Sequence, residues 1–399
     1  MDLEKTICPM VWDHLCINTR GSNRLCCNSI TQDMDFFLDN YEQHWNELRD
    51  NVKKQMLEGK KPDICKACWK KEESGISSLR EQTIFKYKKN LKWDDFLQRV
   101  DKKREAPVEL DLKLGNYCNL SCRMCTSFSS STYATELKRI QKETGIDLSS
   151  NLQESQYKQN QWYQDPVFVQ KIKTFIDNGA YELKFTGGEP LMVPGVEELI
   201  DYCIETNKAK DIQIQFITNG TLITHEWLEK LVHFKVVILT VSIDGTGDTY
   251  EYIRHPTNWV NTYKNLLIVK EFCDKHHQIR LELTFTLQIY NMFQIENMLQ
   301  LRRALNCLIN CIPLDNPDYY DVSNAPEQAK QDALNLLENI EIEENFNEKR
   351  FVNDVVNKLK QPRTKNEFYC KSTVKLYSFT KDPFRGQDFT QQKVYKYYE

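Results

Sequence analysis

The chain has 399 residues, of which 40% are hydrophobic and 28% are charged. This length and apolar fraction are enough to bury a sizeable core in one large domain or two ordinary ones. With 53 basic residues against 57 acidic ones, the net charge is only -4. No global charge therefore favours nucleic acid or an anionic membrane as a partner.

The opening residues and the hydropathy both predict a cytoplasmic chain. Residues 1–10 read MDLEKTICPM, which is acidic and lacks the apolar stretch of a secretory signal. The best apolar run, 236–243, is far too short to span a bilayer. We therefore expect no membrane contact and a reducing compartment, where clustered cysteines bind metal or do chemistry more often than they form disulfides.

Residues 1–80 form a compositional region of their own, with paired cysteines and an amphipathic helix around 42–57. The chain has 14 cysteines, and nine of them fall between residues 8 and 125. Four thiolates of the first region are enough to close a metal site completely. The candidates are Cys8, Cys26 or Cys27, Cys65 and Cys68. Zinc and an iron-sulfur cluster both fit such a set.

Residues 81–107 are expected to be a connecting helix, and residues 108–320 a core domain of alternating strands and helices. Strands are expected at 108–114, 183–185, 212–217, 236–243 and 281–287, and helices at 165–178, 195–206, 224–233 and 259–277. This alternation predicts parallel strands covered by helices, in an open α/β sheet or a barrel. Residues 128–162, rich in Ser, Gln and Thr, are expected to be an insertion or a mobile connection.

The densest chemical signal is the triplet Cys118-x3-Cys122-x2-Cys125, directly after the first expected strand of the core. A zinc knuckle is the structural alternative, but zinc needs four ligands and a lone triplet leaves one missing. Three thiolates suit a [4Fe-4S] cluster that keeps one iron free of protein ligands. A small molecule with an amine and a carboxylate can chelate that iron, so the triplet indicates a catalytic cluster.

Small and polar residues follow several of the expected strands. Gly187-Gly188-Glu189-Pro190 comes after the strand at 183–185, and a Gly-Gly pair lets the backbone approach a ligand closely. The other candidates are Asn219, Ser242, Asp244, Arg254 and Asn291. Ligands of parallel β/α folds gather at the carboxyl ends of strands. For each residue alone, a turn or a helix cap is an equal alternative.

Residues 321–399 are expected to form a C-terminal extension that packs on the core. The part at 324–360 is charged and helical, whereas 364–399 is aromatic and basic without clear periodicity. We expect packing because free tails are poor in aromatic residues. The isolated cysteines from Cys203 onward are assigned to packing, and Cys307 and Cys311 have the four-residue spacing of one helix face.

The triplet, preceded by Tyr117 and followed 62 residues later by the Gly-Gly-Glu-Pro segment, resembles the signature of radical S-adenosylmethionine (SAM) enzymes. The resemblance implies a partial (β/α)6 TIM-like barrel over 108–320. It implies that Cys118, Cys122 and Cys125 hold a [4Fe-4S] cluster and that the segment 187–190 binds the amino group of SAM. Further implied contacts are Ser242 and Asp244 with the SAM ribose or carboxylate, Arg254 with the carboxylate, and Asn291 with the methionine moiety or adenosine.

A second resemblance covers the N-terminal region. The order Cys-Pro-x-x-Trp, a turn with Gly, Cys-Cys and then Cys-x2-Cys-Trp is similar to the twitch module, a shortened form of the SPASM auxiliary-cluster domain. Its place before the core resembles SPASM/twitch proteins found largely in bacteriophages and bacteria, which implies a bacterial or phage-infected cytoplasm. The implied ligands of a second iron-sulfur cluster are Cys8, Cys26, Cys65 and Cys68, with Cys27 as the substitute for Cys26.

Together the resemblances imply an enzyme that cleaves SAM reductively to a 5'-deoxyadenosyl radical, which abstracts hydrogen from an unidentified peptide, protein or small molecule. They also imply an electron donor such as flavodoxin or ferredoxin. Two alternatives stay open from the residues themselves. One is a zinc protein in which both cysteine groups are structural, and the other is a non-catalytic iron-sulfur protein of electron transfer.

Overall fold

The structure is a computed structural model that describes residues 3–19, 21–29, 34–35, 41–73, 77–89, 92–100, 106–148 and 162–399. The chain divides into two compact units, residues 1–115 with 159–215 and residues 116–158 with 216–399. Parts of the expected connecting helix (90–91 and 101–105) and of the expected insertion (149–161) lie outside the described residues. No helix within the described ranges is long and apolar enough to span a bilayer.

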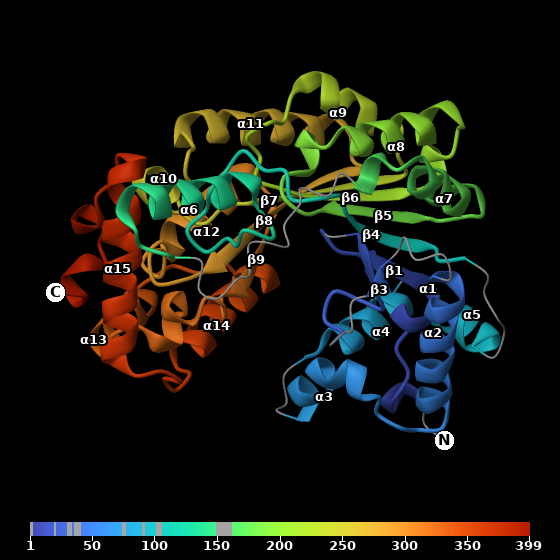
Figure 1. Ribbon diagram of the computed structural model, residues 1–399, viewed down its shortest axis with the longest axis horizontal. Coiled ribbons are helices and arrows are strands. Elements are labelled where there is room, and N and C mark those ends of the chain that lie inside the picture. Colours follow the sequence, from blue (N-terminus) through green and yellow to red (C-terminus); the bar gives the residue numbers. More distant parts are fainter. Residues whose placement is uncertain are drawn as a thin grey trace. The chain divides into compact units, whose positions relative to one another are not determined.

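The first unit contains five strands that pair side by side (Figure 1). They are β1 (His14–Ile17), β2 (Ser22–Arg24), β3 (Met34–Asp35), β4 (Glu109–Lys113) and β5 (Glu182–Thr186), in the order β3-β2-β1-β4-β5. β1 pairs antiparallel with β2 and parallel with β4, and β4 pairs parallel with β5. The N-terminal strands therefore cover the edge of β4 that would otherwise be open.

An aromatic cluster joins three helices of the first unit. The Phe96 ring lies edge-on to Trp12 and Tyr87, with centroid distances of 5.6 and 5.8 Å. Next to it the buried Asp13 accepts a hydrogen bond from the Tyr87 hydroxyl at 2.8 Å and forms an ion pair with Arg99. The helices of this unit are α1 (Met10–Asp13), α2 (Tyr41–Leu57), α3 (Lys66–Glu73), α4 (Leu79–Lys89), α5 (Trp93–Arg99), α7 (Pro166–Asp177) and α8 (Pro194–Glu205).

The second unit contains β7 (Val236–Ser242), β8 (Ile279–Leu287) and β9 (Leu308–Pro313), which pair parallel in that order. β6 (Gln213–Thr218) crosses the boundary, so that its last three residues belong to this unit. The helices here are α6 (Ser131–Thr144), α9 (His225–Leu231), α10 (Gly247–Ile253), α11 (Trp259–Lys275), α12 (Ile295–Leu305), α13 (Glu327–Leu337), α14 (Phe346–Leu359) and α15 (Glu367–Arg385) (Figure 1).

Six strands, β4 to β9, alternate with helices along the chain, which confirms the α/β prediction. Part of the expected insertion is ordered, because residues 131–144 form α6. The Ser130 side chain caps this helix by accepting from the Tyr133 N–H, and Gly145 ends it in the left-handed conformation. Tyr133, Leu137 and Ile140 are buried along one helix face. A sequence rich in polar residues here makes an amphipathic helix.

The helix expected around Cys307 and Cys311 is wrong. α12 ends at Asn306, which adopts a left-handed φ of 49°, and the chain then enters β9. β9 pairs parallel with β8, with Cys311 opposite Phe285. The periodicity of a short apolar run does not distinguish a strand from a helix. Residues 308–313 form a strand because β8 is available for pairing.

The C-terminal segment without clear periodicity forms α15, a helix of 19 residues. The Asn366 side chain caps its first turn by accepting from the N–H groups of Phe368 and Tyr369, and Gly386 ends it with a left-handed φ of 62°. The helix buries Lys381, Asp382 and Arg385 together with its apolar residues. Because these charged residues face inward, the pattern of apolar residues alone understates the buried face.

Asn347 on α14 fastens β9, and its removal should destabilise the second unit. Its side-chain amide donates to the Ile309 C=O and accepts from the Ile309 N–H, both at 2.9 Å. Asn347→Ala leaves two buried backbone groups without these partners, so we expect the free energy of unfolding to fall by about 2 kcal/mol in urea denaturation. Asn353→Ala, on the exposed side of the same helix, should change it little, and equal losses in both variants would contradict this role.

Candidate functional site

The cysteine loop, residues 116–130, connects β4 to α6 and brings the three predicted cysteines together. Cys118 and Cys122 are buried with Leu120, and Met124 and Cys125 pack against them. Burial raises the pKa of Cys122 to about 11, and it also raises the pKa of Cys125, whose thiol is further affected by the charges of the other two. The thiols of Cys122 and Cys125 are therefore protonated at neutral pH unless a metal displaces the protons.

Hydroxyl groups at the start of α6 hold the backbone of the cysteine loop. The Ser130 hydroxyl donates to the Leu120 C=O at 2.5 Å, and the Thr132 hydroxyl donates to the Cys118 C=O at 2.5 Å. The Ser131 hydroxyl accepts from the Cys118 N–H at 3.3 Å. These side chains thus supply hydrogen bonds to loop backbone groups that belong to no helix or strand, as buried backbone groups require.

The end of β6 makes a second attachment to the loop. Asn219, one of the predicted residues, donates from its amide to Asn119 at 2.8 Å and accepts from the N–H and hydroxyl of Thr221. Asn119 in turn donates to the Thr221 hydroxyl at 2.8 Å. Asn219 therefore joins the segment between Cys118 and Cys122 to the carboxyl end of a strand.

Asp244 and Arg254, both predicted residues, form a buried ion pair of 2.8 Å in the second unit. Arg254 also lies 3.9 Å from the Cys122 sulfur. Burial raises the pKa of Asp244, whereas Arg254 and the Thr286 N–H oppose this shift. The guanidinium likewise opposes the raised pKa of Cys122, so it favours the thiolate that a metal requires.

Asn291 is fully buried and engaged with the protein. Its amide N–H groups donate to the C=O of Asp244 and of Thr286 at 3.1 and 2.9 Å, and its oxygen accepts from the Gln288 N–H at 2.8 Å. It therefore braces Asp244 against the end of β8. Ser242, by contrast, is the last residue of β7 and is only partly buried.

The Gly-Gly-Glu-Pro segment directly follows β5 in the first unit. Gly187 has a left-handed φ of 126°, and a Cβ there would lie 2.8 Å from the Gly115 C=O. The Gly188 N–H donates to the same C=O at 3.2 Å, and Glu189 is fully buried. Only glycine fits at 187, because the backbone after β4 passes too close for a side chain.

The four N-terminal candidates Cys8, Cys26, Cys65 and Cys68 line one cavity of the first unit, together with Met10, Leu25 and Arg80 among others. Cys27 does not line it, so this geometry favours Cys26. Burial, together with the charges of neighbouring cysteines, raises the pKa of Cys26 and of Cys65 to about 12. No group of three or more His, Cys, Asp or Glu in the described ranges is arranged to hold a single metal ion.

Arg80, which lines this cavity, is the centre of a polar network that was not identified from the sequence. Arg80 binds Glu72 at 2.7 and 2.9 Å and donates to the C=O of Ile7 at 3.1 Å, directly before Cys8. The Ser78 hydroxyl donates to Glu72 at 2.6 Å, and the Arg80 guanidinium lies 4.9 Å over the Trp69 ring, next to Cys68. Arg80 thus connects the segments that carry Cys8 and Cys68.

A cavity of about 290 Å³ lies beside Cys125 in the second unit. Its walls are mostly apolar and aromatic, and they come from the cysteine loop, from α6, from the segment after β9 and from α15. The lining residues are Cys125, Thr126, Phe128, Tyr133, Leu137, Leu148, Asn316, Pro317, Tyr319 and Tyr377. No feature of the sequence pointed to this cavity, because its walls are far apart in the chain.

Comparisons with known proteins agree with the resemblance to radical SAM enzymes that the sequence motifs indicate. The model of the Radical SAM superfamily matches residues 112–291, a segment that contains the triplet and all the residues expected to contact SAM. The chain is 26% identical over 148 residues to the sporulation killing factor maturation protein SkfB of Bacillus subtilis (37% of this chain, 29% of the relative). It is 27% identical over 180 residues to molybdenum cofactor biosynthesis protein 1 of Dictyostelium discoideum (43% and 24%).

Among solved structures, anSMEcpe with bound AdoMet is similar with a TM-score of 0.38 and 16% identity over 57% of each chain. This chain covers less than a third of the length of SkfB and of the Dictyostelium protein. The family match confirms the radical SAM resemblance predicted from the triplet and the Gly-Gly-Glu-Pro segment.

The N-terminal cavity yields a test of its ligands. The double variant Cys65→Ser/Cys68→Ser removes two of its four thiols, so we expect the cluster at this site to be lost. The iron content of the anaerobically purified protein should fall by about half, since one of two [4Fe-4S] clusters would be missing. Iron, sulfide and zinc analysis measures this. Cys27→Ser is the matched control, because Cys27 stands outside the cavity lining, and an equal loss of iron in that variant would contradict the ligand set.

Proposed function

We propose that this chain, which belongs to the radical SAM superfamily through residues 112–291, abstracts hydrogen from a peptide or small-molecule substrate. The observation that carries the proposal is the cysteine loop. Three thiols stand together on one loop after β4, inside the matched segment, and Arg254 lies beside one of them. Such a set fits a cluster with three protein ligands and one open iron.

Cys118, Cys122 and Cys125 would hold this core [4Fe-4S] cluster. When bound, the cluster and SAM supply a 5'-deoxyadenosyl radical by reductive cleavage. The charge of a cluster also fits this site. Thiols with raised pKa values lose their protons only beside a cationic partner, and a bound metal provides one. Leu120 and Met124 pack with these cysteines and reduce the contact of the thiols with water.

The residues around the strand ends would bind and orient SAM. The segment of Gly187, Gly188, Glu189 and Pro190 would accept the amino group. Ser242 is partly exposed at the end of β7 and would contact the ribose. Asn219, Asp244, Arg254 and Asn291 would shape the site, since the protein contacts of these four fix the ends of β6, β7 and β8.

The N-terminal cavity would hold an auxiliary iron-sulfur cluster through Cys8, Cys26, Cys65 and Cys68. Four neighbouring thiols repel one another as thiolates, so metal must compensate their charge. A fully ligated cluster cannot chelate SAM. It would instead pass an electron to or from the substrate, or keep the N-terminal region folded, in a module of the twitch type.

The substrate class follows from the relatives only in outline. One relative is named a maturation protein and another a cofactor biosynthesis protein, and this division supports either a peptide or a small molecule. The aromatic cavity beside Cys125 would receive an apolar or ring-shaped group near the core cluster. An electron donor such as flavodoxin or ferredoxin would reduce the enzyme.

The core reaction has a direct test. With dithionite and SAM under anaerobic conditions, the reconstituted protein should release 5'-deoxyadenosine, measured by liquid chromatography. Cys122→Ala should abolish the release, because the core cluster loses one of three ligands. Cys273→Ala, at a partly buried cysteine of α11, should retain it. Undiminished release from Cys122→Ala would show that the triplet does not hold the catalytic cluster.

A further inference from the structure

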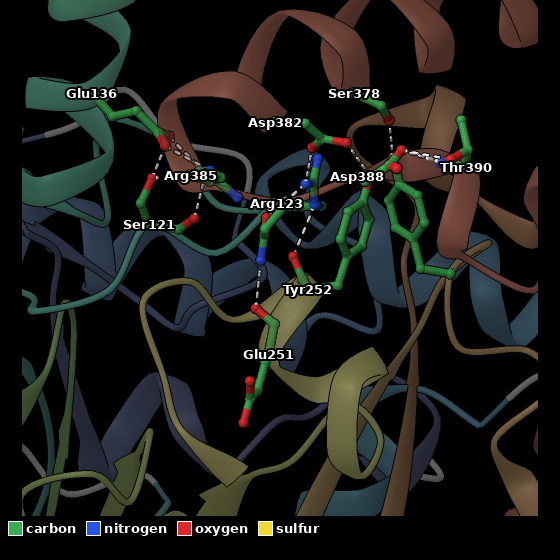
Figure 2. A network of polar contacts seen from close by, with 12 residues as sticks. Ser121, Arg123, Glu136, Glu251, Tyr252, Ser378, Asp382, Arg385, Asp388 and Thr390 are labelled. Carbon is green, nitrogen blue, oxygen red and sulfur yellow. Dashed lines mark hydrogen bonds and ion pairs between the residues drawn. The ribbon is translucent and has the colours of Figure 1, made fainter.

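The cysteine loop is also bound by the C-terminal helix α15, through Arg123 (Figure 2). Arg123 follows Cys122 directly and is fully buried. It forms an ion pair with Asp382 of α15 and donates to Gln387 just beyond that helix at 2.8 Å. Its Nε donates to the Tyr252 C=O at 2.8 Å, and its guanidinium lies 3.5 Å over the Tyr252 ring.

A second arginine, Arg385, reaches the other side of Cys122 (Figure 2). It comes from α15 itself and donates to the C=O and hydroxyl of Ser121 at 2.6 and 3.0 Å. Its Nε and Nη2 also donate to the two carboxylate oxygens of Glu136 of α6, both at 2.6 Å, and the Ser121 hydroxyl donates to the same carboxylate at 2.5 Å. The side chain of Arg385 has no exposed surface.

The spacing of Asp382 and Arg385 lets α15 bind both sequence neighbours of Cys122. Asp382 and Arg385 are three positions apart, so they lie on one face of the helix. Asp382 reaches Arg123 and Arg385 reaches Ser121, and these two loop residues flank Cys122. The backbone N–H groups of Ser121 and Arg123 donate to the C=O groups of His255 and Ile253. Contacts from α10 and α15 thus bind the loop on opposite sides.

Planar guanidinium groups in buried ion pairs restrict the loop more than ordinary contacts would. A guanidinium donates in a fixed fork, so it sets direction as well as distance. Removal of one partner leaves a buried charge without compensation, which the loop can relieve only by moving. Any such movement changes the position of Cys122, because the residues on both of its sides are attached.

We propose that α15 is a positioning element for the core cluster, in which Asp382 acts through Arg123 and Arg385 acts through Ser121 to set the place of Cys122. This inference rests on the proposed function, in that Cys122 is a cluster ligand. Asp382 and Arg385 touch neither SAM nor iron in this scheme. They would instead fix the position of the Cys122 thiol relative to the thiols of Cys118 and Cys125.

Asp382→Asn tests the proposal, because it keeps the shape of the side chain and removes its charge. We expect the rate of 5'-deoxyadenosine release to fall about 10²-fold, the size of effect that a misplacement of about 1 Å can cause. We also expect a changed electron paramagnetic resonance spectrum of the dithionite-reduced protein, in the signal that SAM perturbs. Arg385→Lys, which keeps the charge and loses the fork, should change the same signal to a smaller extent.

The matched control is Glu367→Gln on the same helix. Glu367 also pairs with an arginine, Arg363 at 2.8 Å, but its side chain is 48% exposed. It should leave both the rate and the spectrum as in the unmodified protein. A spectrum and rate of Asp382→Asn that equal those of the control would overturn the proposal, and so would a changed rate with an unchanged spectrum.

A double variant separates positioning from loss of folding. If Asp382 acts through Arg123, then Arg123→Gln/Asp382→Asn should lose no more activity than Asp382→Asn alone. Losses that multiply, or a far-ultraviolet circular dichroism spectrum that shows unfolding in all these variants including Arg385→Lys, would overturn the proposal. Should the unmodified protein bind iron but release no 5'-deoxyadenosine, the proposed function fails, while the iron content and spectrum of Asp382→Asn still test the positioning.

Discussion

The constraint on which the second unit depends is that two buried thiols and a partly buried one stand on a single loop with no regular secondary structure. Beyond a few hydrogen bonds within the loop, its buried backbone groups need partners from elsewhere. The start of α6, the end of α10 and the inner face of α15 bind its backbone, and the end of β6 binds the side chain of Asn119. Four elements that are far apart in the chain therefore meet at the cysteine triplet.

Charge is arranged around the loop in balanced pairs. Arg123 has Asp382, Arg254 has Asp244, and Arg385 has Glu136. A buried arginine without a carboxylate partner would strongly reduce the stability of the fold, so both members of each pair must be in place. Of these three arginines, Arg254 is the one that lies against a cysteine sulfur, where its positive charge would favour a thiolate.

The two groups of cysteines are brought together in different ways. In the first unit four thiols line one cavity, and Arg80 connects the segments that carry Cys8 and Cys68. In the second unit three thiols follow one another on a single loop. Four thiolates would complete the ligand set of a cluster, whereas three would leave one iron open to a small molecule. This difference matches the separate roles proposed for the two sites.

The sequence by itself determined what depends on neighbours along the chain: the spacing of the triplet, the glycines after β5, and the alternation of strands and helices from 108 to 287. These signals are local, because a strand, a turn or a ligand spacing is written in adjacent residues. The tertiary structure alone decided that residues 308–313 pair with β8, that Cys26 rather than Cys27 lines the cavity, and that Asn291 and Arg254 bind protein groups. It also decided that α15 holds the cysteine loop, because Asp382 lies 259 positions from Arg123 and such a pair is made only by folding.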